Sequence, residues 1–159
     1  MLISQNLSTL VPQNLKKNTK METNNSKVLY TAVTHTTGGR TGESRSSDGK
    51  LDIKLSTPGS TGPGTNPEQL FAAGWSACFI GAMGKAAANL QVTLPAGHYV
   101  STEVDLVSGD DGYSLGARLN ISLPGLDPEI AKSIIQGASE TCPYSKAIKG
   151  NIKTEYNLI

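Results

Sequence analysis

The stretch from residue 66 to about residue 90 constrains this chain most, because it joins a helix-start signal to a long apolar run. Its first residue, an asparagine, is a good N-cap; the proline after it suits the first helical position, and Gln69 can complete a capping box. No formal charge lies between Glu68 and Lys85, and apolar residues occupy most positions on every face. A helix that is apolar all round is buried, in a core or in a membrane. The uncharged run is slightly shorter than the roughly 20 residues of a span, and glycines interrupt it. We therefore interpret it as the central helix of a soluble core, open to close approach by another helix.

Composition narrows the class of protein. With 159 residues the chain suits one domain with a real core. A net charge of +1 gives no electrostatic footprint for nucleic acid or an acidic membrane, so neither is expected as a partner. Two cysteines do not make a secreted disulfide framework, but they suffice for one reversible redox pair. His35 and His98 are isolated, and no zinc set can be assembled from them by spacing. We expect no bound metal.

The first 26 residues differ from the rest of the chain. They are rich in Asn, Lys, Thr and Ser, and their apolar residues follow no period. They contain no apolar stretch typical of a secretory signal and no arginine typical of a transit peptide. We predict a disordered or extended tail over residues 1–26, a single domain over residues 27–159, and a cytoplasmic protein. Whether Met21 is the true first residue of the protein stays open.

Strand and helix signals follow one another through the predicted domain. The predicted strands cover Val28–Thr36, Arg40–Arg45, Leu51–Leu55, 100–106, Tyr113–Leu123 and Ile152–Ile159. An Asp-Gly pair at residues 48–49 predicts a hairpin between the second and third strands, and thus an antiparallel meander. A second helix opens at Asp127 with an apolar stripe that begins at Ile130, and it should end near Thr141. A short helical turn follows with Cys142 at its cap. The order of elements predicts an α+β class.

Cys78 lies in the middle of the predicted central helix. An isolated thiol in apolar surroundings is inert, because desolvation raises its pKa, so reactivity requires a nearby cation. The candidate cations are Lys85, Arg40, Arg45 and Arg118. Arg40 is the most informative of them, because it follows two glycines at a predicted strand start. An arginine there can point inward only toward an anion, since a buried unpaired charge is very costly. Glu68 and a Cys78 thiolate are two such anions.

Six sequence runs occur together in one order: VLYTA, TGGR, SSD, GTNPEQLFAAGWSACFIGA, LPG and CPYS-x-A-x-x-GN. In this order, and with both cysteines present, they resemble the organic hydroperoxide resistance proteins, the Ohr branch of the OsmC/Ohr family. The resemblance covers about Lys27 to the C-terminus. One departure is Trp75, where many members carry Tyr; it touches the shape of the pocket and no catalytic role.

The resemblance implies a role for each of four residues. Cys78 is similar to the peroxidatic cysteine, and Cys142 to the resolving cysteine. Arg40 is similar to the arginine that activates the thiolate, and Glu68 to the carboxylate that orients its guanidinium. The implied activity is reduction of alkyl and fatty-acid hydroperoxides to alcohols, through a sulfenic acid and an intramolecular Cys78–Cys142 disulfide.

The implied fold has antiparallel sheets wrapped around a long central helix, in an intertwined homodimer. The implied electron donor is dihydrolipoamide or a lipoylated protein, with no bound cofactor. The apolar residues around the thiol favour organic peroxides over hydrogen peroxide. We predict a pocket lined by Phe71, Trp75, Phe79, Ile80, Met83 and Tyr144. For Tyr144, a hydrogen-bonding role near the site and a packing role both stay open.

The spacing of two site residues leads to a further prediction. Glu68 and Cys78 lie ten residues apart on one helix, which is about 15 Å along its axis. One arginine can hardly clamp both within a single chain. We therefore predict that Arg40 and Glu68 of one subunit serve Cys78 of the other. The alternatives are an OsmC-type peroxidase with a broader substrate range and a non-catalytic protein that binds apolar ligands and uses its cysteines as a redox switch.

Overall fold

The computed structural model describes residues 26–159, of which residues 33–159 form one compact unit. Of the tail predicted over residues 1–26, every residue except Ser26 lies outside the described residues. Residues 26–32 belong to a separate unit and are exposed, without helix or strand. The prediction of a strand that begins at Val28 is therefore wrong for residues 28–33, and the strand begins at Thr34. A run of strand-forming residues becomes a strand only where a neighbour pairs with it.

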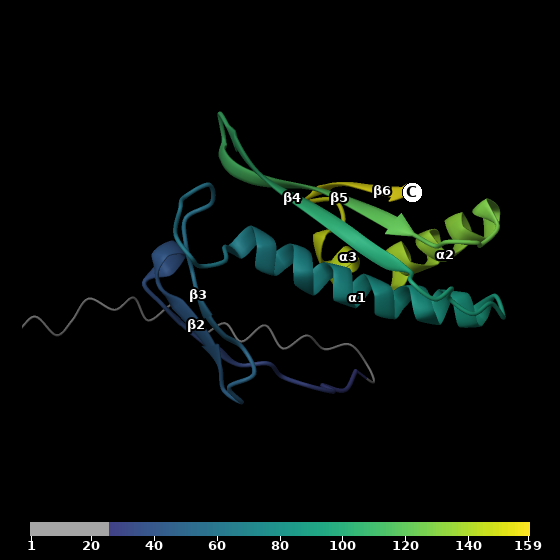
Figure 1. The fold of residues 1–159 in the computed structure, drawn as a ribbon, viewed down its shortest axis with the longest axis horizontal. Coiled ribbons are helices and arrows are strands. Elements are labelled where there is room, and N and C mark those ends of the chain that lie inside the picture. The colour runs from purple at the N-terminus through teal and green to yellow at the C-terminus, as the bar shows by residue number, and fades with distance from the viewer. Residues whose placement is uncertain (1–25) are drawn as a thin grey trace, which may run out of the picture. The chain divides into compact units, whose positions relative to one another are not determined.

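The first sheet is an antiparallel meander in the order β1-β2-β3 (Figure 1). Its strands are β1 (Thr34–Thr37), β2 (Glu43–Ser46) and β3 (Asp52–Lys54). The predicted meander is confirmed, with Gly49 at positive φ in the hairpin between β2 and β3. The start predicted for the second strand is wrong: Gly39–Thr41 form a 3-10 turn, η1. Gly38 and Gly39 both adopt positive φ, which bends the chain at once. Arg40 thus lies on a turn.

The predicted central helix is α1, Pro67–Asn89. The Asn66 side chain accepts a hydrogen bond from the Gln69 backbone N–H at 2.8 Å, as a cap should. The Gln69 side chain, however, accepts from the Thr65 hydroxyl at 2.8 Å, so only half of the capping box forms. Within the chain α1 is buried on one face and exposed on the other. The exposed face carries small side chains: Ala73, Ala77, Gly81, Gly84 and Ala88.

Helix α1 is also the one helix of residues 26–159 that is long and apolar enough, by length and composition, to cross a membrane. Its large side chains Trp75, Phe79 and Met83 are completely buried against the rest of the unit. A core helix of this kind passes the same length and composition test. The packing therefore supports the interpretation of α1 as a core helix.

The second sheet has the order β4-β5-β6, from β4 (Tyr99–Gly109), β5 (Gly112–Ser122) and β6 (Lys153–Leu158). β4 and β5 form the predicted hairpin, whereas β6 runs parallel to β5. The second sheet is thus mixed, and the expectation of antiparallel sheets is wrong for β6. Parallel pairing needs a crossover connection, and α2 (Pro128–Thr141) and α3 (Pro143–Ile148) supply it. The α+β class is confirmed. Ile130 does not join the predicted stripe of α2, because it is exposed and the buried residue is its neighbour Ala131.

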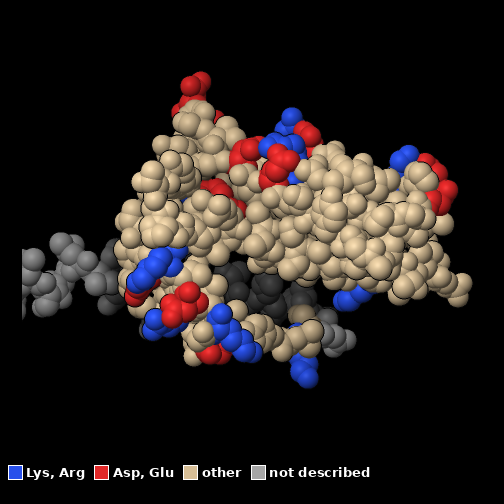
Figure 2. Space-filling view, in the orientation of Figure 1, with Lys and Arg blue, Asp and Glu red and all other residues tan. Residues whose placement is uncertain are grey.

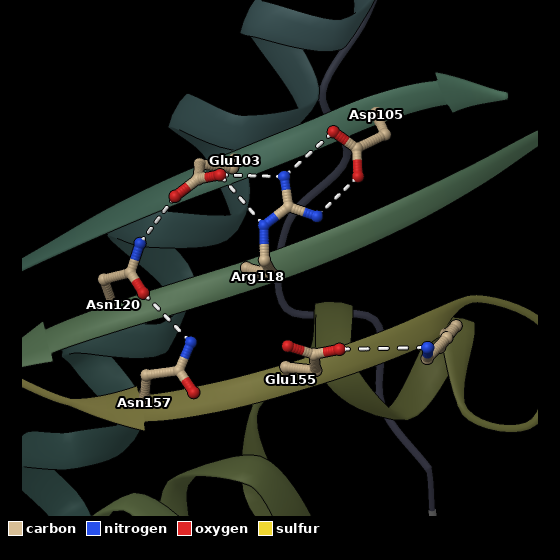
Figure 3. Close-up of polar contacts among 7 residues, drawn as sticks. Glu103, Asp105, Arg118, Asn120, Glu155 and Asn157 are labelled. Carbon is tan, nitrogen blue, oxygen red and sulfur yellow. Dashed lines mark hydrogen bonds and ion pairs between the residues drawn. The ribbon is translucent and has the colours of Figure 1, made fainter.

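The second sheet has one covered and one open face. Ser76 of α1 donates to Thr102 of β4 at 2.7 Å, so even-numbered β4 residues face the helix. On the open face Arg118 lies between Glu103 and Asp105 (Figure 3). Hydrogen bonds from this guanidinium lower the pKa of both carboxyl groups. Arg118 of β5 is thus held by ion pairs to two carboxylates of β4, which we call the cross-strand ladder.

Candidate active site

The structure places the two cysteines side by side. The Cys142 thiol donates to the Cys78 sulfur at a sulfur–sulfur distance of 3.3 Å, and both residues are free thiols. Cys78 lies on α1 and is partly exposed, whereas Cys142 is completely buried at the junction of α2 and α3. A molecule arriving from solvent therefore meets Cys78 first, and an oxidised Cys78 has a thiol directly behind it.

Local sequence rules fix the position of Cys142. Pro143 disfavours a helical conformation in the residue before it, and Cys142 accordingly adopts φ −60° and ψ 122°. The Cys142 N–H donates to the Ala138 carbonyl at 2.8 Å, and its own carbonyl accepts from Lys146 N–H at 2.9 Å. Cys142 thus ends α2 and begins α3, with its backbone held on both sides.

The chain by itself does not activate Cys78. Burial raises the pKa of the Cys78 thiol, and the neighbouring Cys142 raises it further. A hydrogen bond from the Tyr144 backbone N–H to the Cys78 sulfur acts in the opposite direction. No cation of the described chain is among the groups that shift this pKa. Within one chain, therefore, the surroundings of Cys78 favour the thiol over the thiolate.

Arg40 and Glu68 form a second pair. Two parallel hydrogen bonds, at 3.1 and 2.9 Å, join the guanidinium to the carboxylate. The Glu68 side chain is only 11% exposed, and Arg40 holds the pKa of this carboxyl below its ordinary value. Glu68 in turn raises the pKa of Arg40, with a smaller contribution from Tyr113. Glu68 lies ten residues before Cys78 on α1, which is about 15 Å along the helix axis, and Cys78 is not among the groups that shift either pKa. The thiol pair and the ion pair therefore lie apart within one chain.

The two other candidate arginines are paired with carboxylates elsewhere, and Lys85 is exposed on α1, seven residues or about 10 Å along the axis from Cys78. Arg45 donates to Asp52 at 2.9 Å across β2 and β3, and Lys54 pairs with Glu43 on the same strands. Acidic and basic side chains accordingly lie together over these strands (Figure 2). Arg118 is held in its ladder on the open face of the second sheet. Arg40 is therefore the arginine that remains as a candidate to act on the Cys78 sulfur.

The predicted pocket residues differ in their exposure. Trp75, Phe79 and Met83 are closed within the core, and Ile80 lies about 200° around α1 from Cys78. Phe71 and Tyr144 are partly exposed and touch, with ring centroids 5.9 Å apart. Phe71 and Tyr144 are thus the two predicted pocket residues that are both accessible and in contact with each other. The pocket role of all six residues stays a prediction.

Sequence reasoning missed three residues around the thiols. Gly74 lies one turn before Cys78, and a Cβ built on it would come within 2.9 Å of the Tyr144 hydroxyl. A glycine inside a helix signals such a close approach, so this residue could have been found. Ser145 accepts from the Trp75 indole N–H at 3.0 Å, and Tyr156 stacks on Phe79. These two contacts join segments far apart in sequence and carry no local signal.

Metal-ligand side chains do not gather in the part of the chain that the structure describes: no three His, Cys, Asp or Glu side chains form a group that could hold an ion. The Nδ1 atom of His98 lies 2.8 Å from the Pro95 carbonyl oxygen, in a local turn. The expectation that no metal or cofactor is bound stays a prediction.

The fold and the site define an α+β protein whose central helix presents a dithiol at the junction of two further helices. Residues 31–157 match the family described as OsmC-like protein. The chain is 46% identical over 136 residues to the organic hydroperoxide resistance protein of Xanthomonas axonopodis pv. citri, covering 83% of this chain and 96% of the relative. The chain therefore belongs to the OsmC-like family, on the side of its organic hydroperoxide resistance proteins.

Solved structures agree with this assignment. The organic hydroperoxide resistance protein OhrB of Bacillus subtilis superposes with a TM-score of 0.79 at 36% identity, covering 83% of this chain and all of that one. An organic hydroperoxide resistance protein of Legionella pneumophila superposes with a TM-score of 0.77 at 38% identity. The match covers 83% of this chain and 98% of the Legionella chain. The predicted family and the predicted OsmC/Ohr fold are confirmed; the homodimer stays a prediction.

Proposed function

We propose that this protein is a cysteine-based peroxidase that reduces alkyl and fatty-acid hydroperoxides to alcohols. The observation that carries the proposal is the 3.3 Å distance between a partly exposed Cys78 sulfur and a buried Cys142 sulfur. Relatives that share nearly the whole domain are named for resistance to organic hydroperoxides, which supports this substrate class. The same names support an antioxidant role, and we propose that the protein acts in the cytoplasm.

The proposed cycle begins at Cys78. Its thiolate attacks the distal peroxide oxygen, the O–O bond breaks, and the alkoxide takes a proton and leaves as the alcohol. Cys78 becomes a sulfenic acid. The Cys142 thiol then attacks this sulfur, water leaves, and a disulfide forms. A disulfide bond is about 2.05 Å long, so the sulfurs need to approach by only about 1.3 Å from their present 3.3 Å.

The cycle closes when a dithiol donor reopens the disulfide by exchange. Dihydrolipoamide, free or on a lipoylated protein, supplies two electrons and two protons, and becomes a cyclic disulfide itself. Exchange proceeds through a mixed disulfide, and the partly exposed Cys78 sulfur is the one a donor can reach. Rapid closure and reopening would protect Cys78 from further oxidation to a sulfinic acid.

Arg40 supplies the missing positive charge in this proposal, from a second subunit. Within one chain it is fixed on Glu68, and it does not act on Cys78. The exposed small-residue face of α1 and the wholly exposed strand β1 are surfaces that a second copy can cover. In such a homodimer the guanidinium favours the thiolate, and its N–H groups stabilise charge that develops on the peroxide oxygens.

A steady-state assay with dihydrolipoamide tests the proposal. The expected result is turnover with tert-butyl hydroperoxide and a fatty-acid hydroperoxide, and much slower turnover with hydrogen peroxide. Comparable rates with hydrogen peroxide would point to an OsmC-type peroxidase of broader range. A single stoichiometric oxidation without turnover would point to a redox switch.

Two variants assign the cysteines. Cys78→Ser should abolish peroxide reduction, because the attacking sulfur is gone. Cys142→Ser should allow one oxidation of Cys78 and then stall, because no second thiol closes the disulfide. Sustained turnover with dihydrolipoamide in Cys142→Ser would contradict the resolving role.

A further inference from the structure

Ser145 joins three elements behind the thiol pair. It is only 3% exposed and lies on α3, three residues after Cys142. Its hydroxyl oxygen accepts from the Trp75 indole N–H at 3.0 Å, and Ser145 also lies close enough to the Tyr156 hydroxyl to lower the pKa of Tyr156. Trp75 lies on α1 three residues before Cys78, and Tyr156 lies on β6. One serine on the turn of Cys142 is therefore bonded to the helix that carries Cys78 and lies close to the last strand.

Tyr156 makes a second contact, with the residue next to Cys78 in the sequence. Its ring stacks on Phe79, the neighbour of Cys78, with centroids 5.4 Å apart and an interplanar angle of 21°. Burial raises the pKa of Tyr156, so its hydroxyl stays protonated at neutral pH. The ring thus contacts the residue beside one sulfur, and the hydroxyl contacts the turn that carries the other.

Helix α3 needs such support. It has only six residues, Pro143–Ile148, and the side chain of its N-cap, Cys142, makes no capping hydrogen bond. A single short helix is marginal without tertiary contacts. The contacts of Ser145 therefore add to the backbone bonds of Cys142 and to the packing of α3 on α1 and α2 in fixing the direction in which Cys142 points.

We propose that Trp75, Ser145 and Tyr156 form a brace that sets the separation of the Cys78 and Cys142 sulfurs and so favours the disulfide over the dithiol. The proposal rests on the proposed function, in which this disulfide is a step of the cycle. The three members of the brace are positioning residues: they act through the turn of Cys142 and through α1, not on the peroxide.

Equilibration with glutathione measures this effect without any hydroperoxide. Two electrons pass from the Cys78–Cys142 dithiol to glutathione disulfide, an S–S bond forms in the protein, and both protons go to the two glutathione thiols. The equilibrium ratio is the effective concentration of the two protein thiols. Ser145→Ala and Tyr156→Phe should each lower it about three- to tenfold, the range expected for one net hydrogen bond.

Two comparisons between variants make the test specific. Tyr156→Phe retains the ring on Phe79, so it tests the brace even if Ser145→Ala folds poorly. Trp75→Phe combined with Ser145→Ala should lower the effective concentration no more than Ser145→Ala alone, because both changes remove the same bond. Additive losses would show that the two residues act separately and would overturn the brace.

Ser76→Ala is the matched control. It removes the 2.7 Å bond from Ser76 to Thr102, which ties the same helix to β4 without touching α3. A merely structural bond stabilises dithiol and disulfide forms equally, so Ser76→Ala should lower the melting temperature and leave the effective concentration unchanged. If Ser145→Ala and Tyr156→Phe behave in the same way as this control, the brace is wrong.

The two proposals fail differently. A wild-type protein with a high effective concentration but no turnover of organic hydroperoxides would refute the proposed function and leave the brace standing. A wild-type peroxidase whose brace variants keep the full effective concentration would refute the brace alone.

Discussion

Mixing two inactive variants should restore activity if the site is shared between subunits. Cys78→Ser removes the attacking sulfur. Arg40→Met removes the guanidinium, and loss of one charge-stabilising donor of this kind lowers a rate by about 10²–10³. In a mixed dimer one site loses both residues, whereas the other has Cys78 from one chain and Arg40 from its partner. Random assortment of equal amounts makes half of the dimers mixed, so the mixture should recover about a quarter of the wild-type activity.

The structure supplies the reason for this expectation. Arg40 is bound to Glu68 at 2.9 and 3.1 Å, and Glu68 lies about 15 Å along α1 from Cys78. The assay is steady-state peroxidase activity after subunit exchange, with mixed dimers verified by two affinity tags. A mixture of Cys78→Ser with Cys142→Ser is the control, because both sulfurs of a site come from one chain and no complete site can form. Mixed Cys78→Ser and Arg40→Met dimers that stay inactive would refute the shared site.

Three more predictions concern single residues. In a Cys142→Ser background, Arg40→Met should raise the pH midpoint of Cys78 alkylation by about one unit or more, because without Arg40 only the effect of burial, which raises the pKa of Cys78, is left. An unchanged midpoint would exclude Arg40 as the activating charge. Gly74→Ala should displace the Tyr144 hydroxyl and raise KM for bulky hydroperoxides with little change in melting temperature; an unchanged KM would argue against Tyr144 as a pocket wall. The pKa of Glu68 is lowered, so its pairing stabilises the fold above its ordinary value of 4.5 and is lost as the pH falls through the lowered pKa. Denaturation of Glu68→Gln across this range should show a weaker loss of stability at acid pH, and an identical acid profile would count against the ion pair.

Helix starts and tight turns were predictable because their causes lie within a few residues. Asn66 and Asp127 each accept from backbone N–H groups of the first turn, and a proline follows each of them. The hairpin at residues 48–49 needs only a glycine at positive φ after an aspartate. The resemblance to a family then identified Cys78 and Cys142 as a pair, which spacing alone did not do.

The failures share a different cause, since each depends on something distant or on the exact backbone. The segment from Val28 has strand-forming residues but no pairing strand in the described chain. Arg40 left the predicted strand because two consecutive glycines bend the backbone before it. Ser145 bonds to a tryptophan 70 residues away, and no periodicity in either segment predicts that bond.

The chain thus holds two half-sites that it does not join. Burial and the neighbouring thiol favour the thiol form of Cys78 within one chain, while Arg40 is already oriented on Glu68. The face of α1 that residues 33–159 leave exposed carries alanines and glycines every three or four residues, which permit a second helix to come close. If assembly brings Arg40 to the partner's thiol, an isolated chain carries an unreactive cysteine, and the nucleophile is created only in the dimer. Such an arrangement would link peroxide reactivity to correct folding, because a chain with a displaced η1 turn would not bring Arg40 to the partner's sulfur.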